Sequence, residues 1–382
     1  MRVIVGLALL LMCSICDSTQ AATGIRVMLA QDVARVSFKA EGAVAVRSGR
    51  SEWRAVAAPL VVSAVPGGMV LNQDAVSAEA IHLKGGQGDI QVLLTDGETA
   101  GMRVGGVVHL LRKGRGLMVI NELDLEDYVE GVVPYEMNAA WHPEALKGQA
   151  VLARTYALYQ RMANPARAYD VMATVQDQVY RGRQGVDHRI KQAVEDTRGV
   201  ILTYRNMPVL SAFFSTAAGF TEDAMAVWSK DLPYLKGGVD CPFDAASPHF
   251  QWRAVFKLQD LENGLRRQGF PVGTIATFAP LAYSRAGRVA RLRVLHSEGE
   301  LILRGEDLRK AIGYSLVPST QFDIEAIGRE VVLIGRGAGH GVGLCQWGAK
   351  ELASLGYPYQ AILRYYFPGT ELMYLKDASL PG

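Results

Sequence analysis

The sequence predicts an α+β protein, in which a β-rich N-terminal module precedes a mixed domain that carries an α+β insertion. Three observations support this class. Residues 22–118 contain short runs of alternating apolar residues with turn residues between them, as all-β modules do. Residues 143–162 are good helix formers, and residues 245–330 alternate strand and helix patterns. The mixed domain is expected to span residues 119–382.

The first 21 residues have the pattern of a secretory signal peptide. Arg2 supplies a positive charge, residues 3–12 are apolar, and Gln20-Ala21-Ala22 forms a small-residue exit. This pattern predicts export to the periplasm or cell envelope, with an uncleaved membrane anchor as the alternative. No later segment is apolar enough to cross a bilayer, so no membrane span is expected after cleavage.

The charge balance argues against one class of partner. The chain has 40 Lys and Arg against 38 Asp and Glu, for a net charge of +2. Proteins that bind nucleic acids show a basic surplus, so no nucleic-acid partner is expected.

Residues 121–161 hold the strongest candidate for chemistry. An acidic loop is expected to lead to Glu136, in a short apolar turn between Tyr135 and Met137 and close to Trp141. Apolar neighbours raise the pKa of a carboxyl group by desolvation, and such a group can protonate a glycosidic oxygen near neutral pH. The sequence therefore predicts an acid/base at Glu136, with a purely structural carboxylate as the alternative.

A helix is expected next, with Pro143 at its first position and Glu144 in its first turn. Lys147 and Arg154 are two turns apart, so they share a stripe with apolar residues. Near Glu136 they would lower its pKa, so the sequence leaves open whether burial or charge dominates there. The alternative is that each cation extends from the edge of the core into solvent.

The chain after this helix has two further features. A helix is expected from His188 to about residue 199, with Asp187 as its N-cap, followed by strands over residues 200–204 and 208–216. Five glycines between residues 335 and 343 allow the backbone to approach a ligand closely, and a helix follows from Cys345 or Gln346.

Metal and serine chemistry are disfavoured. The seven histidines form no HExxH motif, and the chain has no CxxC, so neither a metal nor a cofactor is expected. Ser215 with His340 as its base is a weak candidate nucleophile, because no GxSxG elbow is present. Signal cleavage would leave Cys241 and Cys345, which either form one disulfide or remain buried thiols.

Several motifs occur in a recognisable order: EDYVEGVVPYEMNAAWHPEALKGQAVLARTYAL, AVEDTRGVILTY, FFSTAAGFTEDAMAVWSKDLPYLKGGVD, VPSTQF, GRGAGHGVGLCQWGA and ILRYYFPGTEL. Together they resemble the stage II sporulation protein D / amidase-enhancer family (SpoIID/LytB) over residues 119–376. The resemblance implies action on peptidoglycan. The sporulation branch of that family consists of lytic transglycosylases that cut glycan strands stripped of stem peptides. The other branch is described as enhancers of cell-wall amidases.

The resemblance also implies roles for individual residues. Glu136 falls on the family's catalytic glutamate. The implied substrate-binding positions are Lys147, Arg154, Ser215, Thr216, Tyr234, Lys236, His340 and Gln346.

A transglycosylase needs a single acid/base group, because the 6-hydroxyl of muramic acid replaces water as the nucleophile. Peptide-free strands carry a lactyl carboxylate on each muramic acid, and we expect Lys147, Arg154 and Lys236 to pair with it. Two alternatives remain. One is a wall-binding enhancer of an amidase that does not cut glycan, and the other is a glycoside hydrolase in which Glu222, Asp223 or Asp231 positions water.

The chain departs from the family pattern at three places. Some sporulation members carry a His/Cys zinc site in the loop after the central helix, but residues 169–182 contain neither residue type, so no zinc is expected there. Ala217 stands where many relatives have serine, and Ala338 where tryptophan is frequent. Cys241 and Cys345 lie in two of the site motifs, which makes a disulfide and two free thiols equally strong expectations.

Overall fold

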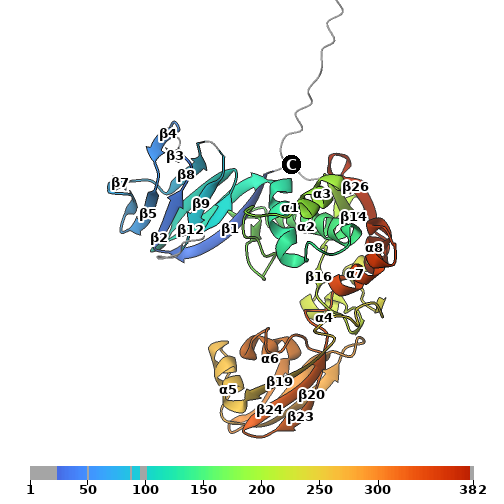
Figure 1. The fold of residues 1–382 in the computed structure, drawn as a ribbon. Coiled ribbons are helices and arrows are strands. Elements are labelled where there is room, and N and C mark those ends of the chain that lie inside the picture. The colour runs from blue at the N-terminus through green and yellow to red at the C-terminus, as the bar shows by residue number, and fades with distance from the viewer. Residues whose placement is uncertain (1–23, 50, 87, 95–100, 379–382) are drawn as a thin grey trace, which may run out of the picture.

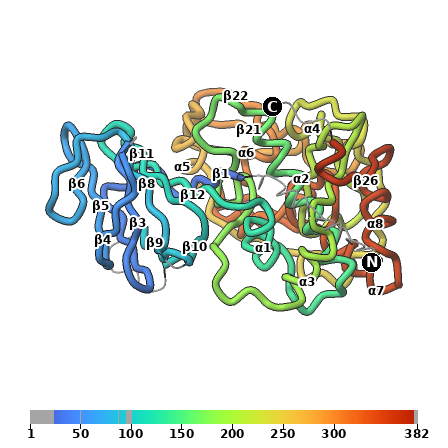
Figure 2. The backbone as a smooth tube through the Cα atoms, turned by 90° about the horizontal axis from the view of Figure 1, so that it is seen from above, coloured from blue at the N-terminus to red at the C-terminus, as the bar shows by residue number. Residues whose placement is uncertain are grey.

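The computed structural model describes residues 24–49, 51–86, 88–94 and 101–378, and the expected signal peptide lies outside them. The α+β class is confirmed, since helices and mixed sheets alternate along the chain. In Figure 1 the β-rich N-terminal module (blue) lies at the left, and a central helical region follows. A separate unit, residues 251–336, extends downward and is called the orange unit below. Figure 2 looks down on the same arrangement, with the N-terminal module to one side.

The N-terminal module consists of two sheets. The first has the strand order β13-β1-β12-β11-β8-β3-β4, and the second the order β10-β9-β2-β5-β6-β7. The strands are β1 (Gly24–Val33), β2 (Arg35–Lys39), β3 (Ala43–Ser48), β4 (Arg54–Ala57), β5 (Leu60–Val65), β6 (Gly68–Leu71), β7 (Asp74–Val76), β8 (Ala80–Gly85), β9 (Ile90–Leu93), β10 (Met102–Val104), β11 (Val107–Lys113), β12 (Gly116–Asp124) and β13 (Val171–Met172). Alternate residues such as Val36, Phe38, Leu60 and Val62 are fully buried, as expected of sheets with one face on a core.

Strand β12 connects the module to the central region. It pairs with both β1 and β11 and runs directly into helix α1 (Leu125–Glu136). The boundary expected between residues 118 and 119 therefore falls inside this strand.

Helix α1 corrects one sequence expectation. The acidic segment is its first turn rather than a loop, and Glu136 is its last residue rather than part of a separate turn. The side chain of Asp124 caps the helix by accepting a hydrogen bond from the Glu126 amide at 2.8 Å. Gly131 and Pro134 concealed the helix in the sequence, because both residues normally disfavour a helix interior. Gly131 is required there because a Cβ atom would collide with the ring of Tyr180.

The central region is organised around α2 (Pro143–Ala163), which confirms the long helix expected from the sequence. It packs against α1, α3 (His188–Asp196), α7 (Gln346–Ser354) and α8 (Tyr359–Tyr366). Asp187 is the N-cap of α3, as predicted. Strand β14 (Val200–Tyr204) lies against α2 and pairs with β15 (Met207–Pro208) and β26 (Glu371–Tyr374), and the short 3₁₀ helix η2 (Leu375–Asp377) follows.

The orange unit in Figure 1 has its own hydrophobic core. Its two sheets have the orders β19-β24-β23 and β20-β21-β22, with helices α5 and α6 packed on them. The elements are β19 (Gln251–Lys257), α5 (Leu258–Arg267), β20 (Ile275–Tyr283), β21 (Val289–His296), β22 (Gly299–Arg304), α6 (Gly305–Ile312), β23 (Phe322–Ile327) and β24 (Glu330–Arg336).

Two segments far apart in the sequence meet where this unit joins the central region. Strand β16 (Phe213–Phe214) pairs in parallel with β25 (Leu344–Cys345), and Thr216 forms a two-way backbone bridge with Ala338. Nearby lie β17 (Gly219–Phe220), α4 (Ala224–Trp228), the 3₁₀ helix η1 (Pro233–Leu235) and β18 (Asp240–Cys241). The glycine motif is therefore held against the turn that contains Ser215. Among the described residues, no helix combines the length and the apolar character needed to cross a membrane.

Candidate functional site

Glu136 lies half-buried at the C-terminal end of α1, between two polar contacts. Its Oε1 accepts a hydrogen bond from the Val179 amide at 3.1 Å, and its main-chain oxygen accepts one from Nε2 of Gln346 at 3.2 Å. Burial raises the pKa of the Glu136 carboxyl group, and the amide of Val179 together with the neighbouring side-chain amide of Gln346 offsets only part of this shift. The sequence left open whether burial or nearby positive charge determines the pKa of Glu136. In the structure, burial dominates.

Gln346 connects α7 to both α1 and α2. It is the first residue of α7 and is 7% exposed, and its Nε2 also lies 3.4 Å from Oε1 of the buried Gln149. The amide is thus fixed between two helices, next to Glu136. Of the expected substrate-binding residues, Gln346 is the one that the structure places in contact with Glu136.

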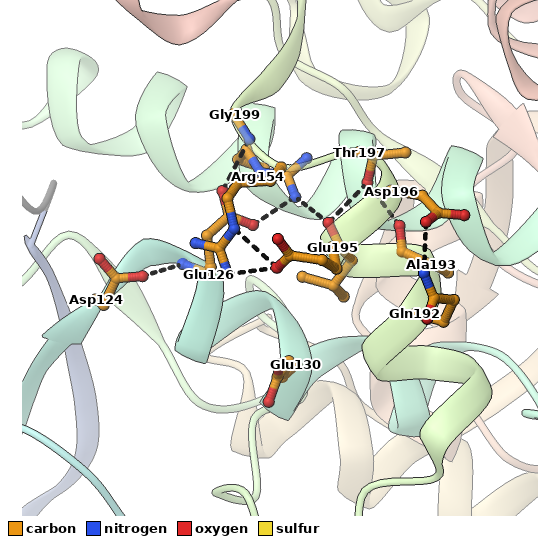
Figure 3. A network of polar contacts seen from close by, with 12 residues as sticks. Asp124, Glu126, Glu130, Arg154, Gln192, Ala193, Glu195, Asp196, Thr197 and Gly199 are labelled. Carbon is orange, nitrogen blue, oxygen red and sulfur yellow. Dashed lines mark hydrogen bonds and ion pairs between the residues drawn. The ribbon is translucent and has the colours of Figure 1, made fainter. Parts of the chain in front are cut away.

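Arg154 lies in the core, and its side chain is 0% exposed. Its Nε and Nη2 donate to the two carboxylate oxygens of Glu126 at 2.8 and 2.6 Å (Figure 3). Its Nη1 donates to the Val200 carbonyl at 2.9 Å. Glu126 also accepts a hydrogen bond from the Gly199 amide at 3.1 Å. The charge of Arg154 is therefore neutralised inside the protein, and its implied role in binding a glycan stays a prediction. A guanidinium inside the core is stable only when its charge and its hydrogen bonds are satisfied by the protein itself.

Lys147 and Lys236 are also engaged by carboxylates, but at the surface. Nζ of Lys147 lies 3.0 Å from Glu144 and 3.1 Å from Asp196, and Lys236 pairs with Asp231. The continuous stripe of cations expected on α2 is therefore replaced by one buried and one surface ion pair.

The turn at Ser215 is stabilised by the buried carboxylate of Asp244. Oδ2 of Asp244 accepts hydrogen bonds from the amides of Ala217 and Ala218 at 2.6 and 2.8 Å. The Ser215 hydroxyl lies 3.1 Å from Oγ1 of Thr216, which is fully buried and 2.6 Å from the Ser247 hydroxyl. Ser215 remains half-buried, whereas Thr216 belongs to the core.

His340 is packed between aromatic rings rather than aimed at Ser215. Its ring centroid lies 4.8 Å from Trp228 and 5.7 Å from Phe214, and its Nδ1 accepts a hydrogen bond from the Val342 amide at 3.0 Å. Burial, together with the positive charge of Arg288, lowers the pKa of His340 to about 3. The pairing of Ser215 with His340 as its base is not formed, since the Ser215 hydroxyl bonds to Thr216 instead.

Tyr234 is also buried. It is 5% exposed, and its hydroxyl accepts a hydrogen bond from the Leu210 amide at 3.1 Å. Its ring packs beside Tyr204, with centroids 5.5 Å apart. The hydroxyl and the ring of Tyr234 thus both contact residues of the protein, which stabilises the fold.

The carboxylates considered for a hydrolase are occupied by local contacts. Asp223 caps α4 by accepting a hydrogen bond from the Met225 amide, and Oε1 of the buried Glu222 accepts one from the Asp223 amide at 2.9 Å. Asp231 pairs with Lys236. Each of the three therefore has a structural partner.

The cysteines lie together in the core as free thiols. Sγ of Cys241 is 3.2 Å from the Tyr366 hydroxyl, and Sγ of Cys345 is 3.3 Å from Oδ2 of Asp244. Among the described residues, Cys241, Asp244 and Cys345 are the group whose ligand atoms lie close enough together, within 4.8 Å, to share a metal ion. Burial raises the pKa of the Cys345 thiol, which favours its protonated form over a metal-binding thiolate.

Sequence reasoning missed several contacts of Glu136 and of helix α7. Val179 contacts the carboxylate from a loop whose sequence has no recognisable motif. Trp141 and Trp347 approach each other with ring centroids 5.3 Å apart, and Nζ of Lys350 lies 4.2 Å from the Trp347 ring. The helical spacing of Gln346 and Lys350 was visible in the sequence, but the meeting of α7 with Trp141 was not.

Comparisons with known proteins agree on a family. Residues 113–204 match the family described as stage II sporulation protein, a range that contains Glu136, Lys147 and Arg154. Residues 239–343 match a domain of unknown function, which includes the orange unit of Figure 1.

Relatives with known sequences extend the similarity. Stage II sporulation protein D of Bacillus subtilis is 33% identical over 268 residues, which is 66% of this chain and 75% of that protein. An uncharacterized protein of Brachyspira hyodysenteriae is 33% identical over 258 residues, or 67% of this chain and 68% of that protein. The amidase enhancer of Bacillus subtilis is 27% identical over 288 residues, which is only 40% of that protein.

Proposed function

Because the chain belongs to the stage II sporulation protein family, we propose that it is a lytic transglycosylase that cuts the glycan strands of peptidoglycan. The names of its relatives, a sporulation protein and an amidase enhancer, support a role at the cell wall. The bond cut joins N-acetylmuramic acid to N-acetylglucosamine in strands that have lost their stem peptides. We also propose that the chain is exported and acts in the periplasm or cell envelope.

Glu136 carries the chemistry in this proposal. Its carboxylic acid protonates the glycosidic oxygen as the bond to the muramic acid C1 breaks. The resulting carboxylate then takes the proton from the muramic acid 6-hydroxyl, whose oxygen attacks C1 and closes the 1,6-anhydro ring. No water is consumed, and the glutamate ends in its starting protonation state.

The observation that supports this role is the environment of Glu136. A general acid must hold its proton until the leaving oxygen needs it, and burial that raises its pKa favours the protonated form. The hydrogen bonds from Val179 and Gln346 fix its position from two different segments of the chain. A catalytic group must be held in place in this way to act efficiently.

The test is digestion of peptide-stripped and intact peptidoglycan by the purified chain lacking residues 1–21, with products identified by mass spectrometry. Anhydro-muramic ends from stripped strands are expected, and Glu136→Gln is expected to reduce their formation on the order of 10²- to 10⁴-fold. Lys376→Gln serves as a control, since Lys376 is exposed, lies over the ring of Tyr374 and is not among the expected substrate-binding residues. Reducing ends would instead indicate a hydrolase, and equal activity of Glu136→Gln would remove Glu136 from the mechanism.

The similarity to an amidase enhancer favours a second candidate function. In this case the chain binds the wall without cutting glycan and stimulates an N-acetylmuramoyl-L-alanine amidase. The same digestion with an added amidase separates the two. Faster release of stem peptides without anhydro ends supports the enhancer, and anhydro ends without amidase support the transglycosylase.

A further inference from the structure

The cations first expected to recognise the substrate are all engaged by carboxylates of the protein. Arg154 is paired with Glu126, Lys147 with Glu144 and Asp196, and Lys236 with Asp231. A glycan carboxylate would have to displace these internal partners. Another cation is therefore needed if the site recognises an anionic strand.

Lys350 belongs to α7, the helix whose first residue contacts Glu136, and among the described residues it has no such partner. Its Nζ lies 4.2 Å from the ring centroid of Trp347 and 5.6 Å from that of Trp141, and no carboxylate of the described residues lies within ion-pair distance of it. Lys350 is half-buried, so its position is constrained by the two rings. Aromatic faces attract an ammonium group without neutralising its charge, which leaves the charge available to an anion.

Helix α7 connects Lys350 to the segment that contains the candidate acid. Gln346 and Lys350 are four residues apart, so they share one face of the helix with a rise of about 6 Å between them. Gln346 donates to the main chain of Glu136, and Trp141 follows Glu136 by one short loop. Lys350 therefore lies on the helix whose first residue binds the main chain of Glu136, and its ammonium group is held beside Trp141, in the loop that follows Glu136.

We propose that Lys350, held by Trp141 and Trp347, binds the lactyl carboxylate of a muramic acid in the strand that Glu136 cuts. This inference rests on the proposed function for its ligand. It assigns the selection of peptide-free strands to Lys350 in place of Lys147, Arg154 and Lys236. A stem peptide converts the lactyl carboxylate to an amide, which removes the negative charge that an ammonium would recognise.

Binding is measured in the Glu136→Gln background, so that cleavage does not consume the ligand. Two ligands are compared by calorimetry: peptide-stripped peptidoglycan glycan, and chitohexaose, whose sugars have no lactyl group. Lys350→Met keeps the apolar stem and removes the charge. It is expected to weaken binding of stripped glycan about tenfold while changing that of chitohexaose less than about twofold. Lys350→Arg, which keeps the charge, is expected to retain most of the preference.

Lys376→Met is the matched control, because Lys376 also lies over an aromatic ring, that of Tyr374, but in a different part of the domain. It should leave both affinities unchanged. Equal losses for both glycans, an unchanged affinity of Lys350→Met for stripped glycan, or no binding at all would overturn the proposal. If binding depends on Lys350 but the wild-type chain produces no anhydro ends, the transglycosylase proposal alone fails.

Discussion

The side-chain amide of Gln346 donates a hydrogen bond to the main-chain oxygen of Glu136 at 3.2 Å, across 210 positions of sequence. This contact ties the first turn of α7 to the last turn of α1. It also links the glycine motif, which directly precedes α7, to the candidate acid. The site is therefore assembled from two ends of one domain, between which the orange unit of Figure 1 is inserted.

The pH dependence of cleavage should reflect the raised pKa of Glu136. Only the protonated carboxyl group can donate to the glycosidic oxygen, so the rate is expected to fall as pH rises through a value above the ordinary 4.5. Gln346→Leu removes one hydrogen bond that lowers this pKa, so it should move the falling limb to higher pH. The measurement is kcat against pH on stripped glycan. A limb that moves to lower pH in Gln346→Leu would contradict this account.

Stability should change with pH for the same reason. Glu136 binds its proton more tightly in the folded chain than in the unfolded chain, so the stability linked to this proton is fully present below the unfolded pKa. It is lost as pH rises through the raised folded pKa. Glu136→Gln has no such loss. The free energy of unfolding of this variant should therefore increase relative to that of the wild type as pH rises from about 4 to 7. Urea unfolding at several pH values measures the difference, and a constant difference would show that Glu136 does not titrate abnormally.

The buried pair of Arg154 and Glu126 should matter for folding. Arg154→Met leaves the Glu126 carboxylate buried without its cation, and we expect a loss of about 3–5 kcal/mol in the free energy of unfolding. Adding Glu126→Gln should recover part of that loss, because the stranded charge is removed.

Lys147→Met provides the comparison, since its ion pairs lie at the surface and should cost less than about 1 kcal/mol. Urea unfolding compares the three variants. A similar cost for Arg154→Met and Lys147→Met would contradict the assignment of Arg154 to the core.

Asp244 should stabilise the turn at Ser215. Asp244→Ala leaves the amides of Ala217 and Ala218 buried without an acceptor, for an expected loss of about 2–4 kcal/mol. Asp244→Asn keeps one side-chain oxygen as an acceptor and should lose less. Thermal unfolding checks the order, and an alanine variant as stable as the wild type would show that the turn does not depend on this carboxylate.

The thiols can be counted directly. In the chain lacking residues 1–21, prepared without reductant, Cys241 and Cys345 are expected to react slowly with a thiol reagent in the folded state, because both are buried. Denaturation should release two thiols per chain. No thiol after denaturation, with a mass lower by two hydrogens, would show that the pair has been oxidised to a disulfide.

Much of the local structure could be predicted. Helix α2 with Pro143 at its first position and the N-cap of α3 follow from residue types at fixed spacings, and so do the strand and helix patterns of the orange unit of Figure 1. Helix α1 was missed because Gly131 and Pro134 lower its intrinsic propensity, and the packing of Gly131 on Tyr180 outweighs that cost.

The sequence by itself determined the order of the motifs, the family and the identity of Glu136 as the acid candidate, because these depend on residue types and short spacings. Only the tertiary structure decided which of the cations discussed are paired with carboxylates of the protein and which are not. Arg154 and Lys350 are both basic residues on helices, yet one lies inside the core against Glu126 and the other lies over the rings of Trp141 and Trp347. That difference arises from burial and from partners distant in sequence, which no local spacing encodes. The surroundings of Glu136 have the same origin, because Val179 and Gln346 reach it from separate segments.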